Sequence, residues 1–514
     1  MMEIDAMNVN SERSQSLWMA TAPEHRAQPL VTNERADVVV VGSGIAGLSV
    51  AYELCRDEQS VIVVDRGALA RGMTARTSAH LASVLDDFYH ELIRLRGLEE
   101  ARHYFHSQVG ALDRVEQIQA SENIECDFRR LDGYLFAASD EDVSILEREI
   151  DACHGLGFSG VAWDRLPGTG DGGEHRCLRF PEQGRFHPLK YLDGLIRCIE
   201  RDGGRLYAET PVVSVEEKGG ETIVRTRQGY EIRARAAVIA TNSPINDWIA
   251  IHTKQAPYRT YVVAGRVPSG SVVDALYWDT LDPYHYVRLQ PSGAEHAWLI
   301  VGGEDHKTGQ ADDQPERIAR LTQWAKARFP RMGDPEYAWS GQVMEPVDYL
   351  AYIGRNPGND NIFVVTGDSG EGLSNGVAGS LILRDLILGR DNAWTDVYQP
   401  NRISIGAAGE YISENLTMPA NLAEHLTGGE LSSFDELKPG DGGLFRRGTA
   451  TLAAYRDAGG ELHIRSATCT HAGCVVHWNG FERCWDCPCH GSHFSVDGEP
   501  LNAPAFKPLA AADE

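Results

Sequence analysis

The chain has 514 residues, 42% of them hydrophobic, and a formal net charge of −26 at pH 7. This length is enough for two or three domains, and no apolar run approaches the roughly 18 residues that a membrane-spanning helix needs. The negative charge argues against nucleic acid or anionic membrane surfaces as partners, and ten cysteines are too few for a disulfide scaffold in a chain of this length.

Residues 1–35 read as a polar N-terminal extension without the basic start and apolar core of an export signal, so we expect a cytoplasmic protein. A β-branched run over 37–41 then leads into a glycine-rich turn, an apolar helix and a second strand over 61–65. In a dinucleotide-binding unit the helix start holds the pyrophosphate, and a carboxylate about 20 residues later binds the ribose. A tight turn without a ligand is the alternative. The residues expected to bind the nucleotide are Gly42, Gly44, Ile45, Ala46, Gly47, Asp65 and Arg66.

Three later segments, 71–80, 236–243 and 361–374, are turns and strand ends rich in small and hydroxyl residues. Together with the first unit they resemble the D-amino acid oxidase, glycine oxidase and sarcosine oxidase superfamily of flavoproteins, over roughly residues 36–395. The resemblance implies that the nucleotide is FAD, that the last turn passes close to the flavin ring, and that a strand at Val213 contacts the adenine side. It adds the following expected cofactor contacts: Thr74, Arg76, Thr77, Val213, Thr241, Gly367, Gly370, Gly372, Leu373 and Ser374.

The expected fold class is therefore α/β, with a Rossmann-like FAD-binding domain and an antiparallel-sheet substrate domain. The FAD-binding domain is assembled from separated pieces at about 36–114, 186–254 and 341–395, and the substrate domain from about 115–185 and 255–340. Within the second substrate piece, residues 284–289 and 297–302 read as strands, and 315–329 as a helix.

Three side chains are candidates for work on the substrate. His80 follows the turn that approaches the flavin edge, where an imidazole can tune charge or accept a proton; packing is its alternative role. His285 and Tyr286 alternate along one strand, so only one of them can face the substrate. Arg288 is able to pair with a substrate carboxylate if its strand faces the flavin; the alternative is an exposed strand arginine. The catalytic candidates are His80, Tyr286 and Arg288.

The substrate class is indicated by a missing arginine. Amino-acid-oxidising members of the superfamily commonly carry Gly-Leu-Arg-Pro before an Asp-x-x-Pro-x-Ile-Gly segment. The matching region, 341–354, reads Gly-Gln-Val-Met-Glu-Pro and then Asp-Tyr-Leu-Ala-Tyr-Ile-Gly. The difference weakens an amino-acid substrate and favours an amine, as in the polyamine-derivative oxidoreductases that this chain also resembles.

The C-terminal segment carries the most specific pattern, a Cys-x-His pair followed by a Cys-x-x-His pair. In a Rieske [2Fe-2S] cluster one iron is held by two thiolates and the other by two imidazoles, so a chain must offer two such pairs on facing loops. A structural zinc site with two cysteines and two histidines is the alternative. The expected cluster ligands are Cys469, His471, Cys487 and His490.

Residues 431–514 resemble a small all-β Rieske domain as a whole, and residues 396–430 read as the connector that precedes it. In the Rieske proteins of respiratory cytochrome complexes, the positions of Cys474 and Cys489 carry a disulfide between the two cluster loops, which the resemblance implies here. Phe494 stands where the high-potential relatives have a tyrosine, so a hydrogen bond to a cluster ligand is missing. We therefore expect a reduction potential below the top of the Rieske range.

Two cofactors of different electron capacity suggest an oxidoreductase. FAD accepts two electrons from a C–H bond next to nitrogen or oxygen, and a Rieske cluster carries one at a time. We predict an FAD-dependent amine or amino-acid oxidoreductase, dehydrogenase or oxidase, whose electrons are relayed through the cluster. The alternative is an electron-transfer component that serves another enzyme and has no amine substrate of its own. The expected partner is a small-molecule substrate, a redox protein is a second candidate, and the sequence does not specify the oligomeric state.

Overall fold

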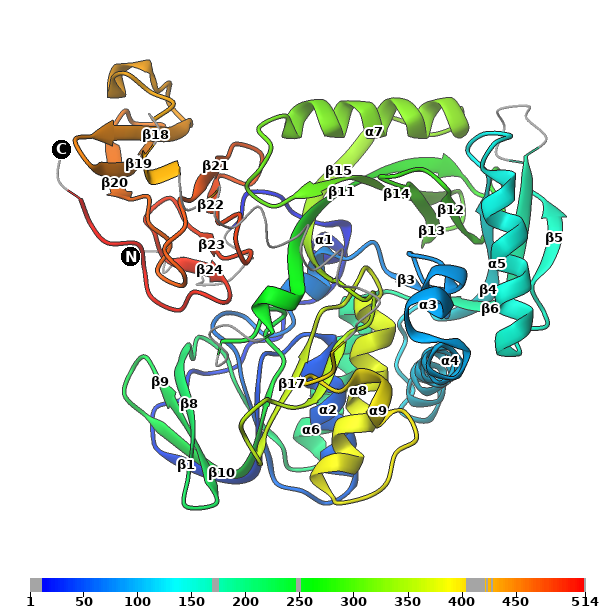
Figure 1. The fold of residues 1–514 in the computed structure, drawn as a ribbon, viewed down its shortest axis with the longest axis horizontal. Coiled ribbons are helices and arrows are strands. Elements are labelled where there is room, and N and C mark those ends of the chain that lie inside the picture. The colour runs from blue at the N-terminus through cyan, green and yellow to red at the C-terminus, as the bar shows by residue number, and fades with distance from the viewer. Residues whose placement is uncertain are drawn as a thin grey trace.

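The computed structural model describes residues 12–168, 175–245, 251–403, 421, 424–426 and 429–512. Its first layer is a sheet of eight strands, in which a parallel core carries an antiparallel edge strand and a hairpin (Figure 1). The valines of the first two strands are buried throughout, as expected for parallel strands that are covered on both faces. Along the sheet the strands are β16 (Tyr352–Arg355), β17 (Ile362–Thr366), β10 (Glu231–Ile239), β1 (Glu34–Val41), β2 (Val61–Val64) and β7 (Arg205–Tyr207), and the hairpin of β8 (Val212–Lys218) and β9 (Glu221–Thr226) joins β10.

Three helices pack together on one face of this sheet (Figure 1). Helix α2 (Ile45–Arg56) begins at the glycine-rich turn, and it contacts both α6 (Pro188–Arg201) and α8 (Gly372–Ile387). The helix α8 begins at the second glycine-rich turn, directly after β17. Parallel strands therefore deliver two helix N-termini to the same edge of the sheet, which is where this class of fold binds its nucleotide.

The second layer is a sheet of nine strands, antiparallel except for the parallel pair of β12 with β4. The predicted strands and helix of the substrate piece are present, each shifted by a few residues. In sheet order the strands are β15 (Pro335–Pro346), β11 (Gln255–Pro268), β14 (His296–Lys307), β13 (Tyr286–Ser292), β12 (Leu276–Asp279), β4 (Arg129–Phe136), β6 (Arg176–Arg185) and β3 (His80–Leu81), with β5 (Ala162–Arg165) beside β6.

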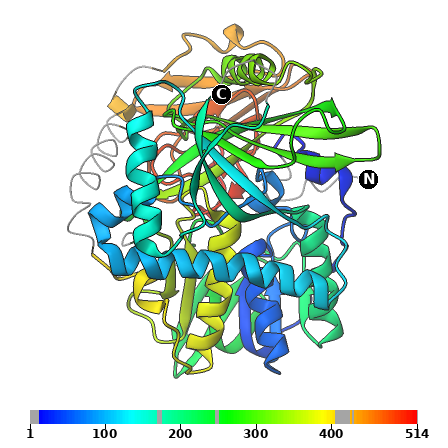
Figure 2. The same ribbon diagram turned by 90° about the vertical axis from the view of Figure 1, so that its right-hand side faces the viewer.

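Four helices accompany the second sheet. The helix α7 (Gln314–Arg328) packs on β11 and β14, and α5 (Val143–Leu156) packs on β6. The long helix α4 (Leu98–Ser121) contacts α8 of the first layer and α5 of the second, so it spans the junction between them (Figure 2). A shorter helix, α3 (Tyr89–Arg96), lies against α4 and α5.

The C-terminal part is built from strands, as predicted. One small sheet contains β18 (Gly442–Arg447), β19 (Ala450–Arg456) and β20 (Leu462–Ser466). The other contains β21 (His477–Asn479), β22 (Cys484–Asp486), β23 (His493–Phe494) and β24 (Pro500–Asn502). Their shared core includes Leu444, Trp485 and Phe494, and the unit lies to one side of both large sheets (Figure 1). The α/β fold class with a small all-β unit is confirmed.

The described part of the N-terminal extension is packed into the protein. Trp18, on the short helix α1 (Leu17–Thr21), is fully buried, and its Nε1 donates to the Thr77 carbonyl at 2.7 Å. Much of the predicted connector, residues 404–420, 422–423 and 427–428, lies outside the described residues. In the part of the chain that is described, no helix has the length and apolar character needed to cross a membrane.

Candidate active site

A cavity of about 260 Å³ is lined by residues of both large sheets. The turn before α2, the short helix η2 (Met73–Arg76), the end of β10, the turn before α8 and β15 all contribute to its wall. These are the segments from which the sequence predicts FAD contacts, although they lie up to 331 positions apart in the chain, from Gly42 to Leu373. The predicted cofactor residues found in the wall are Gly42, Gly44, Ile45, Ala46, Asp65, Arg66, Thr74, Arg76, Thr77, Thr241, Gly367, Gly370, Gly372 and Leu373.

The glycine-rich turn before α2 is held by close backbone contacts. Gly42 has φ +105°, and a Cβ there would lie 2.3 Å from the Ala240 carbonyl oxygen. A Cβ at Gly47 would lie 1.9 Å from the Gly42 carbonyl oxygen, so this glycine serves the packing of helix against strand. Asp65 accepts hydrogen bonds from the Ser43 amide at 2.8 Å and the Ser43 hydroxyl at 2.6 Å. The carboxylate predicted to bind ribose thus also fixes the turn.

One end of the cavity is acidic. Its wall there carries five carboxylic acids and two tyrosines, contributed by the segment after β3, by β13 and β14, by β15 and by the turn before α8. Tyr284 donates a hydrogen bond to Asp86, and the Tyr286 hydroxyl lies 2.6 Å from Thr260 Oγ1. The acidic residues are Asp86, Asp305, Glu345, Asp368 and Glu371, with Asp87 behind them.

Burial raises the pKa of every one of these acids, because a carboxylate in this cavity has lost most of its water. The pKa reaches about 7 for Asp87 and Asp305 and about 6 for Asp368. Asp86 and Glu371 hydrogen-bond to each other, which requires a shared proton. Oδ1 of Asp305 has no hydrogen-bond partner among the described residues. This end of the cavity can therefore hold or release protons near neutral pH.

The two loops of the C-terminal unit bring the four predicted cluster ligands together. The rings of His471 and His490 lie 4.8 Å apart, and a hydrogen bond between the sulfur atoms joins Cys469 and Cys487. This bond lowers the pKa of the Cys469 thiol and, with burial, raises that of Cys487. Cys474 and Cys489 form the predicted disulfide.

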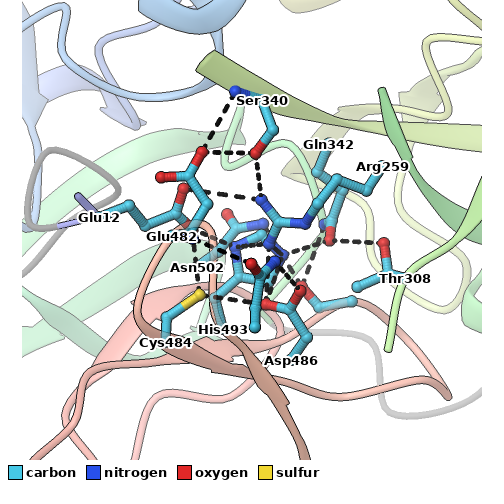
Figure 3. Close-up of polar contacts among 12 residues, drawn as sticks. Glu12, Arg259, Thr308, Ser340, Gln342, Glu482, Cys484, Asp486, His493 and Asn502 are labelled. Atoms are coloured by element: carbon cyan, nitrogen blue, oxygen red, sulfur yellow. Dashed lines mark hydrogen bonds and ion pairs between the residues drawn. The ribbon is translucent and has the colours of Figure 1, made fainter. Parts of the chain in front are cut away.

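A buried network of charges joins the C-terminal unit to the rest of the chain (Figure 3). Arg259, on β11, is fully buried and donates to Asp486 at 2.8 Å and to the Ser340 hydroxyl at 2.8 Å. Arg76 donates to Glu482 at 3.2 Å. Glu12, from the N-terminal extension, lies 3.8 Å from Arg259. Four distant parts of the sequence thus meet in one set of ion pairs.

Comparison with known proteins agrees with this geometry. The family model described as FAD dependent oxidoreductase matches residues 37–386, more than half of the chain. The chain belongs to this family. The model of the Rieske [2Fe-2S] domain matches residues 430–513.

Three relatives illustrate the similarity of this flavoprotein. The “Putative Rieske 2Fe-2S iron-sulfur protein YhfW” of Bacillus subtilis (strain 168) is 30% identical over 98% of each chain. The gamma-glutamylputrescine oxidoreductase of Escherichia coli (strain K12) is 24% identical, over 72% of this chain and 88% of its own. A crystal structure of glycine oxidase from Geobacillus kaustophilus superposes with a TM-score of 0.62 at 18% identity, covering 72% of this chain and all of that one.

The residues present can hold both FAD, the cofactor of this family, and the [2Fe-2S] cluster of the Rieske domain. The crowded glycines at the start of α2 leave backbone free to approach a pyrophosphate, and the cavity runs from there to the acidic end. The paired sulfurs and the paired imidazoles supply two ligands for each iron of a [2Fe-2S] cluster, and the buried Nδ1 of His490 has no hydrogen-bond partner among the described residues. The flavoprotein therefore has a place for FAD and for a [2Fe-2S] cluster.

Three predicted cofactor residues lie outside the wall of the cavity. Gly47 packs the helix against the turn, and Ser374 points back within α8, where its hydroxyl donates to the Glu371 carbonyl at 3.3 Å. Val213 is absent from the wall, whereas Thr210, Pro211 and Val212 of the same segment line it. The contact of Val213 with the adenine side stays a prediction.

The three catalytic candidates have different surroundings. Tyr286 lines the cavity, whereas His285 points the other way, bonds Asp279 at 3.0 Å and stacks on a tryptophan. His80 also lines the cavity, but its Nε2 donates to the Val287 carbonyl at 3.1 Å, and burial with the Arg288 charge lowers its pKa to about 3. It is a neutral imidazole whose proton is already bonded.

Arg288 does not line the cavity, so the suggestion that it meets a substrate carboxylate is not supported. Its guanidinium is fully buried under Trp18 and donates to the Ala79, Phe186 and Leu289 carbonyls. It is also not the exposed strand arginine of the alternative. The chain folds backbone carbonyls around it, and this environment has no signal in the local sequence.

The acidic residues are what the sequence-based reasoning missed. Asp368 and Glu371 lie between the glycines of the turn before α8, and Asp305 lies near the end of β14. Asp86 and Asp87 follow the predicted flavin-edge segment closely. A signal was available, because several acids occur in segments that the resemblance places around the flavin.

Proposed function

We propose that this flavoprotein oxidises a cationic amine and passes the electrons to its own Rieske cluster. The observation that carries the substrate class is the acidic end of the cavity. A buried group of carboxylates favours a ligand that brings positive charge, since each unpaired carboxylate pays a desolvation cost that an ammonium group offsets.

The positions of the basic residues support the same substrate class. Among the described residues in the cavity wall, the arginines are Arg66, Arg76 and Arg227, and lysine is not found. Each of the three guanidinium groups bonds the C-terminal unit: Arg66 the Pro500 carbonyl, Arg76 Glu482 and Arg227 Glu499. A substrate carboxylate at the acidic end would therefore meet repulsion, which favours an amine over an amino acid.

The acids also suit the proton chemistry of amine oxidation. FAD, when bound, supplies acceptance of two electrons from the C–H bond next to the amine nitrogen, and the cluster supplies one-electron transfer. An ammonium substrate has to lose its proton before that bond is attacked. Asp305 lines the cavity, has a pKa of about 7 and keeps one oxygen without a partner among the described residues, so it is suited to accept this proton. Tyr286 and Tyr284 would orient the amine beside it.

The test is an anaerobic titration of the holoenzyme with a matched panel of diamines, N-methyl amines, monoamines and the corresponding amino acids. We expect amines to bleach the flavin absorbance and the electron paramagnetic resonance (EPR) signal of the reduced cluster then to appear. Asp305→Asn should weaken the response to amines and leave reduction by dithionite intact. Reduction by amino acids but not by their amines would refute the substrate class.

Reduction by NADH with no response to any amine would point instead to an electron-transfer component that serves another enzyme. We also propose a cytoplasmic location and an outside redox protein as the electron acceptor, because the cluster needs a one-electron partner after each turnover.

A further inference from the structure

The side chain of Gln342 reaches from the cavity to the cluster loop. Gln342 lies on β15 and belongs to the wall of the cavity. Its Nε2 donates to the Gly491 carbonyl at 3.0 Å, and Gly491 directly follows the cluster ligand His490. One buried side-chain amide of β15 thus connects the wall of the cavity to the loop that holds the cluster, and Asn502 of the C-terminal unit, also in the wall, bonds the same carbonyl at 3.5 Å.

The contact at Gly491 is too close for any other residue. Gly491 has φ +75°, and a Cβ there would lie 2.6 Å from Gln342 Nε2 and 2.7 Å from Pro257 Cβ. A glycine is therefore needed both for the backbone conformation and for the approach of β11 and β15 to the loop. The backbone of the cluster loop touches the flavoprotein sheet directly.

Gln342 is held in this position from its other side. Its Oε1 accepts a hydrogen bond from His493 Nε2 at 2.6 Å, so both ends of the amide are bound to the C-terminal unit. Two residues further along β15, the Met344 amide donates to Asp368 at 2.9 Å, and the Met344 carbonyl accepts from the Ser369 amide at 3.0 Å. The same strand therefore binds the cluster loop and the glycine-rich turn that resembles a flavin-ring contact.

A second contact encloses the histidine side of the cluster loops. His252, from the short helix η3 (His252–Lys254) that leads into β11, has its ring 5.0 Å from His471 and 5.5 Å from His490. His252 is 2% exposed and His490 5% exposed. The two histidine ligands thus face the flavoprotein part of the same chain, and the side chain of His490 is shielded from bulk water.

We propose that Gln342 is the residue through which electrons cross from the flavin cavity to the Rieske cluster loop, within a single chain. This rests on the proposed relay function. Oxidation of one amine C–N bond to an imine releases two electrons and two protons, and each crossing carries one electron. A one-electron acceptor protein takes the first electron from the cluster before the second electron crosses, so the two electrons of one oxidation leave the flavin in two crossings.

The test measures the crossing itself, without substrate. A light flash, with EDTA as the sacrificial electron donor, reduces the flavin of the anaerobic holoenzyme, and the absorbance of the cluster is followed at several protein concentrations. For the wild type we expect a rate that does not change with concentration. Gln342→Met keeps the volume and loses the amide, and Gln342→Glu keeps the acceptor for His493 and loses the donor to Gly491. Both should slow the crossing about tenfold or more, the size typical of lost outer contacts at metal sites.

Glu482→Gln is the matched control, because Glu482 belongs to the same domain interface and does not line the cavity. It should change the crossing rate far less than either Gln342 variant. EPR of the dithionite-reduced proteins reports the cluster content, so loss of the cluster is recognised separately. An unchanged rate in Gln342→Met, or equal slowing in Glu482→Gln, would overturn the role of Gln342. A rate that rises with protein concentration would overturn transfer within one chain. If flash reduction of the wild-type flavin never reaches the cluster, the relay function itself is wrong.

Discussion

Replacing Arg259 with methionine is expected to loosen the Rieske domain from the flavoprotein layers. Methionine preserves much of the volume of the side chain and removes the charge. The wild-type guanidinium is 0% exposed and lies 2.8 Å from Asp486 and 3.8 Å from Glu12. Without it, two buried carboxylates lose a compensating cation.

The magnitude follows from the distances. At 2.8 Å, and with an effective dielectric constant of about 20, the attraction between Arg259 and Asp486 is about 6 kcal/mol before desolvation is counted. Removal of one partner from a buried pair typically costs about 3–5 kcal/mol, because the other charge remains buried. With a urea dependence of about 1–3 kcal/mol per molar for a small domain, the midpoint should fall by about 1 M or more.

The assay is urea unfolding followed by the visible circular dichroism of the cluster, which reports the Rieske domain separately from the flavin domain. Arg227→Ala is the control, because Arg227 forms a half-exposed ion pair with Glu499 at 3.0 Å across the same interface. Such a pair contributes about 0–1 kcal/mol, so the midpoint of this variant should hardly move. Equal midpoints for Arg259→Met and Arg227→Ala would refute the reasoning that the buried network fixes the domain.

Three further outcomes are expected. Burial opposes the ionisation of Glu12, but the charges of two arginines and a histidine outweigh it and hold its pKa at about 2, below the ordinary 4.5. The contribution of ionised Glu12 to stability is therefore full above pH 4.5 and is lost as the pH falls towards 2. The unfolding curves of Glu12→Gln and the wild type should accordingly converge in acid. Because burial raises the pKa of Asp305 to about 7, amine affinity should rise as pH increases through 7, and Asp305→Asn should flatten that profile in binding titrations. Replacing Cys474 and Cys489 together by serine removes a disulfide that joins residues 15 positions apart and should lower the free energy of unfolding by about 3 kcal/mol, seen as loss of cluster absorbance at a lower temperature. In each of these three cases, a variant whose curve matches that of the wild type would contradict the contact on which the prediction rests.

The motifs that local spacing defines could be predicted well. Cys469 with His471, and Cys487 with His490, lie two and three positions apart, so each loop carries its own ligand pair whatever the rest of the chain does. The turn at Gly42 has the same character, because a strand, a turn and a helix in immediate succession dictate its backbone. These residues depend on few long-range contacts.

Residues whose role depends on the partner across a sheet were predicted less well. Arg288 and Tyr286 are two positions apart on β13 and should share a face, yet Tyr286 meets the cavity, whereas Arg288 is enclosed by carbonyls from two other segments. Val213 lies at a register shift of the β8–β9 hairpin, between Val212 and Ser214, which no local pattern specified.

By itself the sequence determined that the chain carries a dinucleotide-binding turn and the ligand pairs of an iron–sulfur cluster, since glycine spacing and cysteine-histidine spacing are short-range properties of the backbone and of the ligand atoms. Only the tertiary structure decided that acids from four separate segments gather at one end of the cavity, and that Gln342 meets Gly491 across 149 positions of chain. Such contacts form because burying apolar surface brings distant segments together, and the composition of each segment alone does not say which of its polar side chains will face another.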